Sequence, residues 1–336
     1  MGGVAHSAHP SDQKNRGFGP GFFSPMPTLF VSIANYRDTE TPHTVADLFA
    51  QAARPERVRV GVLAQLVSGV DDDCLVPSHP QVRQLNLHAS LSRGACWARS
   101  IVLEQLREDE DYVLQIDSHS RFVPGWDQRF IDMLAQCPSD KPVLSSYPVA
   151  YVPPRQLSAP VIPVHEPKSF GDDGILTFKS RTIGYERRPA APIASPFVGA
   201  GCLFAPSALF DEVPYDPHLY FIGEEVTLGA RLWTHGWDAF APNDVLMYHD
   251  YTQGRGRPKH WEDHVDWSVL NRRAVERVRH LLAGAAPTDA QALKDIERHG
   301  LGTARSLADY EAFAGIDFKA RRWDEGRWGP LPRADA

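Results

Sequence analysis

Between residues 28 and 149, short apolar runs alternate with segments that carry apolar residues at helical spacing, and this alternation most constrains the fold. The apolar runs predict strands at residues 28–34, 57–65, 82–88, 112–117 and 143–149. The intervening helices are predicted at about residues 45–52, 94–106 and 125–137. Strands that alternate with helices in this way favour an α/β fold, in which a mostly parallel central sheet is flanked by helices.

The rest of the chain departs from this pattern in two places. Residues 153–196 contain recurrent prolines, and residues 175–186 are typical of an exposed hairpin, so we expect an insertion that flanks the sheet and covers part of a cleft. The alternating pattern resumes with a strand at 199–206 and a helix at about 224–234, followed by the segment 238–251. Residues from 261 on are predicted to form helices at 261–282, 288–299 and 303–314. The predicted organisation is a flexible tail over 1–27, one domain over 28–260 with the insertion at 153–196, and a helical C-terminal extension over 261–336.

Composition limits the partners and the compartment. The chain has 35 Lys and Arg against 42 Asp and Glu, a net charge of −7, which argues against nucleic acid or an anionic membrane as a partner. No apolar run reaches the ~18 residues that a membrane span needs, and the N-terminus lacks the apolar segment of a secretory signal. The four scattered cysteines form no CxxC pair, which is typical of free thiols in a reducing compartment. We therefore expect a cytoplasmic protein.

A carboxylate and an imidazole follow the apolar strand at residues 112–117. In DYVLQIDSHSRFVPGWD, Asp117 ends the run and His119 stands two residues later. Ligands of open α/β sheets bind beyond the carboxyl ends of strands, and a carboxylate with an imidazole suits a divalent ion such as Mn²⁺ or Mg²⁺. Another apolar run, VLMY, is followed by His249, which supplies a third ligand if the two strand ends lie close together. The alternative is an aspartate that caps a turn beside a solvated histidine.

Further motifs are candidates for contact with a ligand. Glu224 and Glu225 open a helix after Gly223, although acidic residues in a first helical turn are also favoured by the helix dipole. Arg93 lies just before a predicted helix and Arg99 lies within it, and a cation near a helix start favours anion binding over a role in the helix. The alternative for Arg93 is an ordinary surface arginine. The glycines of VGAGC would let a ligand lie against the main chain, and polar groups at the end of the first strand, in NYRD, could contact a base or ribose.

Taken in order, these motifs resemble one family. They are NYRD, RGxxxAR, D-x-H, GAG, GEE and a late strand that ends in histidine. The pattern is similar to the N-acetylglucosaminyltransferases related to the enzyme that modifies hydroxyproline on Skp1. The resemblance covers about residues 28–251, and extends to about 282, with QIDSHSRFVPGWD as its most specific part. It implies a GT-A fold, a Rossmann-like α/β arrangement shared with the polypeptide O-glycosyltransferases.

The resemblance also implies roles for the motif residues. Asp117, His119 and His249 would hold Mn²⁺ or Mg²⁺ against the diphosphate of a UDP-sugar. Glu224 and Glu225 would lie at the junction of sugar and acceptor. The other donor-binding residues would be Arg37 and Asp38 near the uridine, Arg93 and Gly94 near the diphosphate and sugar, Ser118 between two metal ligands, and Gly199, Ala200 and Gly201 against the hexose. Arg93 would also stabilise charge on the departing UDP.

The reaction implied is the metal-dependent transfer of GlcNAc, or a related hexose, from a UDP-sugar such as UDP-GlcNAc to a hydroxyl of a peptide, protein or small molecule. The family's members retain the anomeric configuration, so retention is expected here. Two alternatives stay open: a metal-dependent phosphoester hydrolase, and a non-catalytic protein that binds a nucleotide-sugar. Acceptor recognition is expected to depend on residues 153–196 and on the segment from 261, where no motif matches.

Overall fold

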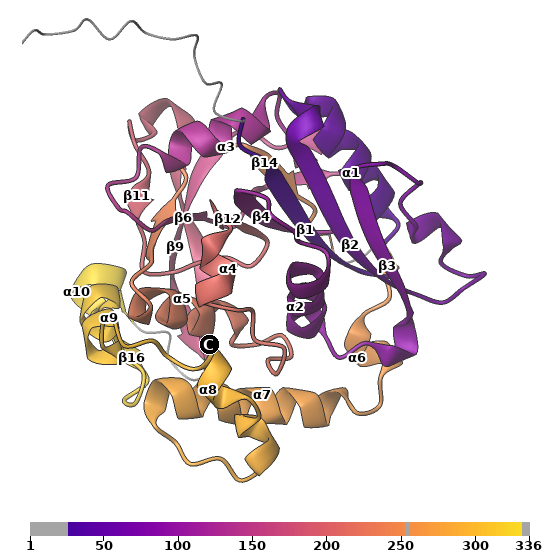
Figure 1. Cartoon of the computed structure of the whole chain (residues 1–336). Helices are drawn as coiled ribbons and strands as arrows, with labels where there is room; N and C mark the ends of the chain where they lie inside the picture. The colour runs from indigo at the N-terminus through magenta and orange to yellow at the C-terminus, as the bar shows by residue number, and fades with distance from the viewer. Residues whose placement is uncertain (1–25, 253–255, 331–336) are drawn as a thin grey trace, which may run out of the picture.

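The computed structural model describes residues 26–252 and 256–330, and its centre is an eight-stranded sheet (Figure 1). The strands lie in the order β11-β13-β6-β12-β4-β1-β2-β3. Four neighbouring pairs are parallel, and the three pairs that involve β11 or β12 are antiparallel. The strands are β1 (Leu29–Tyr36), β2 (Val58–Leu66), β3 (Val82–His88), β4 (Tyr112–Asp117), β6 (Pro142–Ser145), β11 (Ile193–Ala194), β12 (Cys202–Pro206) and β13 (Asp238–Ala241).

Successive side chains of a strand point to opposite faces of the sheet, so apolar residues are presented on both. Helices pack against each face. Along β1, Leu29, Val31 and Ile33 enter the core beneath α1 (Glu40–Gln51) and α3 (Trp126–Leu134). Phe30 enters the other core, beneath α2 (Ala95–Gln105) and α5 (Glu224–Thr234). The predicted α/β fold with a central sheet flanked by helices is therefore confirmed. All four cysteines lie buried and free within it.

A second, four-stranded sheet has the order β5-β14-β7-β8. Its strands are β5 (Ser120–Phe122), β14 (Met247–His249), β7 (Val149–Val152) and β8 (Gln156–Leu157). The prediction of a single strand over 143–149 is wrong, because β6 ends at Ser145 in the large sheet and β7 begins at Val149 in this one. Pro148 lies between them and has no N–H to donate to a ladder.

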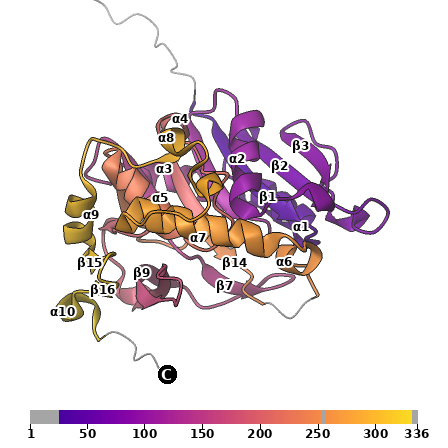
Figure 2. The ribbon, with the colours of Figure 1, turned by 90° about the horizontal axis from the view of Figure 1, so that it is seen from below.

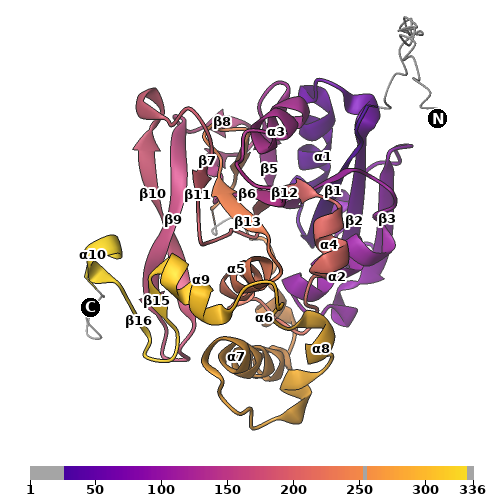
Figure 3. The same cartoon turned by 60° about the vertical axis from the view of Figure 1, so that its left-hand side comes forward.

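The segment 153–196 contains a long antiparallel hairpin of β9 (Val161–Phe170) and β10 (Leu176–Gly184). The predicted hairpin at 175–186 is only its second strand. Figure 3 shows the hairpin on the side of the molecule opposite β3.

The C-terminal segment packs against α5 and joins the same core as the sheet. In place of the single helix predicted at 261–282, the chain forms α6 (His260–Asp263) and α7 (Trp267–Ala283), because His264 is extended and breaks the helix. Figure 2 shows α7 running across the molecule toward α6. The remaining elements are α4 (Ala208–Glu212), α8 (Ile296–His299), α9 (Leu307–Ala314), β15 (Ile316–Asp317), β16 (Arg322–Trp323) and α10 (Glu325–Trp328).

Two predictions from the sequence concern the N-terminal tail and membrane-spanning segments. The tail predicted over 1–27 lies outside the described residues except for its last two positions. Within residues 26–252 and 256–330, the structure has no helix of the length and hydrophobicity required for a membrane crossing.

Candidate active site

A cavity of about 370 Å³ lies at the carboxyl ends of β1 and β4. This is the edge of a parallel sheet at which ligands of α/β proteins bind. Its inner wall is formed by the ends of β1, β4 and β14 and the start of α2, and its outer wall by the loop before α5 and by the segment that leads into α6. The residues that line it include Tyr36, Asp38, Gln65, Ser92, Gly94, Arg99, Asp117–His119, Tyr220, Phe221, His249–Thr252 and Arg257–Trp261. No residue of the insertion 153–196 is among those lining it.

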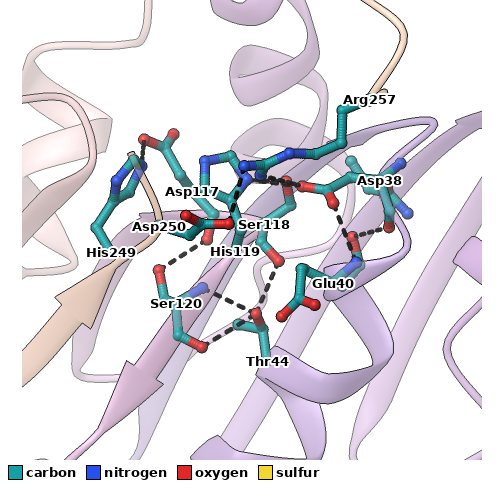
Figure 4. Close-up of polar contacts among 12 residues, drawn as sticks. Asp38, Glu40, Thr44, Asp117, Ser118, His119, Ser120, His249, Asp250 and Arg257 are labelled. Carbon is teal, nitrogen blue, oxygen red and sulfur yellow. Dashed lines mark hydrogen bonds and ion pairs between the residues drawn. The ribbon is translucent and has the colours of Figure 1, made fainter. Parts of the chain in front are cut away.

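Asp117, His119 and His249 come together at the inner wall (Figure 4). Asp117 ends β4, and β5 begins three residues later and pairs with β14 so that Ser120 lies opposite His249. The ring centroids of the two histidines are 4.5 Å apart. One ligand atom from each of the three residues lies within 4.8 Å of the others, so the pairing of two short strands brings together residues 132 positions apart.

The orientation of His119 is fixed by a carboxylate. Its Nδ1 lies 2.6 Å from Oδ2 of Asp38, which also accepts a hydrogen bond from Ser118 Oγ at 2.7 Å. Burial raises the pKa of Asp38, but its bonds with His119 and Ser118 outweigh this and hold that pKa below its usual range. With Nδ1 protonated toward Asp38, Nε2 of His119 keeps a free lone pair, which is the usual arrangement of a metal-binding histidine. One carboxylate and two imidazoles form a donor set that fits a divalent transition ion such as Mn²⁺.

Asp117 is held from three sides. Its Oδ1 accepts a hydrogen bond from Arg99 at 2.5 Å, and its Oδ2 lies 3.1 Å from Nε2 of His249. A Cβ at Gly201 would come within 2.7 Å of Oδ2, so only glycine leaves room for the carboxylate there. Burial raises the pKa of Asp117, but Arg99 and His249 hold it well below the usual range, whereas burial lowers the pKa of His249. Both shifts favour the ligand-competent forms, a carboxylate and a neutral imidazole.

The two glutamates at the start of α5 differ in their surroundings. Glu224 is 4% exposed, and its Oε1 accepts hydrogen bonds from Arg99 and from the hydroxyl of Tyr215. Glu225 accepts a hydrogen bond from the hydroxyl of Tyr147 and another, at 2.9 Å, from the main-chain N–H of Ala200. Burial raises the pKa of Glu225 to about 7. The adjacent acids therefore differ in charge: Glu224 forms an ion pair, and Glu225 exchanges a proton near neutral pH.

The remaining predicted residues are placed as follows. Gly94 lines the cavity at φ +102°, where a Cβ would collide with Tyr220. Arg93 is exposed and is not among the lining residues. Arg37 turns away to Asp71 and Asp263, at 2.7 and 2.9 Å, while Asp38 and Ser118 face the cavity. The strip Gly199–Gly201 lies behind the lining residues, with Gly199 packed against the Tyr147 and His165 side chains.

Sequence reasoning named Arg99 without its partners and missed Arg257 and Lys259. Arg99 had a usable signal, because it shares a buried helix face with Cys96 and Val102, where a lone arginine needs a partner. Arg257 had none. It lies 3.4 Å from Asp38 and 3.1 Å from Asp250, and together with Lys259 it places positive charge on the outer wall.

A family of known proteins matches almost all of the described chain. The family model described as Glycosyltransferase (GlcNAc) matches residues 28–81 and 77–320. The chain belongs to this glycosyltransferase family. The match runs through the segment from 261, which had no recognisable motif. No curated protein sequence matches the chain.

Solved structures support the fold assignment. The chain is similar to GalNAc-T7, whose structure was determined with UDP, GalNAc and Mn²⁺, with a TM-score of 0.63 and 14% identity. That match covers 92% of this chain and 59% of the GalNAc-T7 chain, so this chain spans well under two thirds of its length. A weaker similarity, with a TM-score of 0.42 and 13% identity over 81% of this chain and 70% of the other, links it to S. aureus TarS 1-349 in complex with UDP-GlcNAc. The likeness to GalNAc-T7 identifies the fold as GT-A.

Proposed function

We propose that this glycosyltransferase moves GlcNAc, or a related hexose, from a UDP-sugar to a hydroxyl acceptor, in a metal-dependent reaction that retains configuration. The observation that carries the proposal is the convergence of Asp117, His119 and His249 on one wall of the cavity. GalNAc-T7, which shares the fold, was solved with UDP, GalNAc and Mn²⁺, and this supports a nucleoside diphosphate donor and a divalent ion.

The charges around the cluster suit a divalent cation. Asp38, Asp117, Glu224 and Asp250 contribute four carboxylates, and Arg99 and Arg257 contribute two guanidinium groups that bind them. The carboxylates of this group outnumber its guanidinium groups by two. Because uncompensated charge in a partly buried site is costly, this excess favours the binding of a cation.

Asp117, His119 and His249 would hold the ion, which supplies positive charge against the diphosphate as the sugar–phosphate bond breaks. Arg257 and Lys259 face the same space from the outer wall, and we assign them, with Arg93 as first predicted, to the growing charge on the leaving UDP. Asp38 and Tyr36 are the cavity-lining residues of the segment expected at the uridine.

Glu225 is proposed to orient the sugar or the acceptor, with Ala200 and Gly201 beside it. Its carboxylate is bound by the Ala200 N–H on one side and by Tyr147 on the other, so it holds one position. A fixed carboxylate is suited to accept hydrogen bonds from hydroxyl groups. The acceptor itself is proposed to be a peptide, protein or small-molecule hydroxyl. The link to the enzymes that modify Skp1 stays a prediction.

The test is a panel of donors. Purified protein is incubated with UDP-GlcNAc, UDP-GalNAc or UDP-glucose, with Mn²⁺ or with EDTA, and with peptides that carry serine, threonine or hydroxyproline. We expect UDP release and a peptide mass increased by one sugar unit of the donor, an N-acetylhexosamine from UDP-GlcNAc, with UDP-GlcNAc fastest and no turnover in EDTA. Turnover that is unchanged in EDTA would refute the metal dependence. Release of phosphate from simple phosphoesters, or UDP binding with no transfer to any acceptor, would favour a hydrolase or a binding protein.

A further inference from the structure

One buried arginine joins the two acidic motifs of the site. Arg99 is 5% exposed, and its two terminal nitrogens bind different carboxylates, Glu224 at the start of α5 and Asp117 at the end of β4. Its Nε is buried without a hydrogen-bond partner. A guanidinium removed from water is held firmly only when its charge is paired, and here both pairing partners belong to motifs of the predicted site.

The bond to Arg99 distinguishes the two carboxylate oxygens of Asp117. Arg99 occupies Oδ1, so Oδ2 is left beside Nε2 of His249, at 3.1 Å. Gly201 lies on the opposite side and leaves room for Oδ2, because a Cβ at that position would come within 2.7 Å of it. The carboxylate therefore cannot rotate without breaking an ion pair, and Oδ2 is the oxygen that faces the ligand cluster.

The hydrogen bonds of Glu224 hold its side chain beside Arg99. Its Oε1 accepts from both Arg99 and Tyr215, and its side chain is buried, whereas that of Glu225 is partly exposed. Glu225, the adjacent residue, points to Tyr147 and Ala200 instead. The acidic pair is thus divided between two tasks.

We propose that Arg99 is a positioning residue that presents Oδ2 of Asp117 to the cation, and that Glu224 acts through Arg99 instead of contacting sugar or acceptor. This proposal rests on the cation site of the proposed function. Glu224 balances the charge of Arg99. Without that balance, the guanidinium binds Asp117 alone and competes with the cation for its carboxylate. Partners that orient a metal ligand typically change affinity for the metal by about 10- to 100-fold when they are removed.

The experiment measures Mn²⁺ binding to the full chain without donor, by electron paramagnetic resonance of free Mn²⁺ and by calorimetry. The variants are Arg99→Lys, Glu224→Gln and the two combined. We expect each single variant to bind Mn²⁺ about 10- to 100-fold more weakly. Because Glu224 acts through Arg99, the double variant should bind no more weakly than Arg99→Lys alone.

Arg277→Lys is the matched control, because Arg277 is an equally buried arginine that binds Asp216 at 2.7 Å, away from the cavity. It should lower the melting temperature and leave Mn²⁺ affinity unchanged. Wild-type affinity in both single variants, or additive losses in the double variant, would overturn the proposal. A wild-type chain that binds no Mn²⁺ would instead refute the metal site of the proposed function. Glu224→Gln keeps the shape of the side chain, so it tests the idea even if Arg99→Lys fails to fold.

Discussion

Two carboxyl groups near the cavity have the same chemistry and opposite protonation behaviour. Asp117 lies beside Arg99 and His249. Burial raises its pKa, but the charge of Arg99 and the hydrogen bonds of both residues outweigh this, so its pKa falls. Glu225 has only Tyr147 and a main-chain N–H as direct partners, burial dominates, and its pKa rises to about 7. The ion pair with Arg99 therefore separates an acid held as an anion from one that exchanges a proton near neutral pH.

The change with the largest expected effect removes the permanent anion. Asp117→Asn keeps the size of the side chain but loses the charge that would hold the cation, so we expect turnover to fall by about a thousandfold or more. Steady-state UDP release measures this, and Mn²⁺ binding should be lost in parallel. Asp109→Asn, at an exposed position, is the control. An Asp117→Asn variant with near-normal turnover would remove the distinction between the two acids.

An intermediate effect is expected for Glu225→Gln. If the anion of Glu225 orients substrate, kcat/KM of the wild type rises through pH 7, and the variant loses this rise. We expect a loss of about 10- to 100-fold at pH 8 and a smaller loss at pH 6. The measurement is kcat/KM from pH 5.5 to 8.5, with exposed Glu186→Gln as control. Equal losses at both pH values would show that ionisation of Glu225 does not matter for turnover.

The same variant has a stability signature with a defined sign. Because the folded pKa lies above the ordinary value of 4.5, the folded state keeps a proton that the unfolded state releases. The stabilisation is complete below about pH 4.5 and is lost as the pH rises to about 7. The melting temperature of the wild type should therefore fall by a few degrees relative to Glu225→Gln between pH 5 and 7.5. A difference in melting temperature that stays constant across this pH range would mean that Glu225 is ionised throughout it.

The smallest effect is expected for Tyr147→Phe. The Tyr147 hydroxyl donates to Glu225 and lowers its pKa, so its removal should move the midpoint of the kcat/KM profile upward by up to about one unit. Tyr185→Phe is a matched control, because that hydroxyl binds Asp244, away from the cavity. A midpoint that stays in place or moves downward would assign the profile to another group.

The spacing of apolar residues in the sequence predicted those strands and helices in which this spacing is regular. The strand at 82–88, the strand at 112–117 and the helix at 224–234 match the structure to the residue, because each is bounded by a clear change of pattern. Strand pairing could not be predicted from such patterns. β12 is antiparallel to both its neighbours, and the run at 143–149 is divided between two sheets, since both features depend on contacts distant in sequence.

Some residues of the site were predicted from the sequence and others were not, because the site also depends on contacts distant in sequence. Asp117 and His119 are adjacent to a recognisable strand end, and the structure places His249 beside them. Arg99 was noticed only as part of a helix, because the sequence does not show that its partners are Asp117 and Glu224. Arg257 reaches the cavity from a loop, where no periodicity distinguishes one arginine from another.

The pairing of β14 with β5 has a consequence for biosynthesis. Asp117 and His119 leave the ribosome long before His249, and the wall built from residues 257–261 follows later still. A growing chain that ends before β14 has two of the three candidate ligands and lacks the residues of the outer wall. Such a chain would bind the ion weakly and would not turn over the donor. The nascent polypeptide then becomes competent only after β14 has paired with β5 and residues 257–261 have followed it.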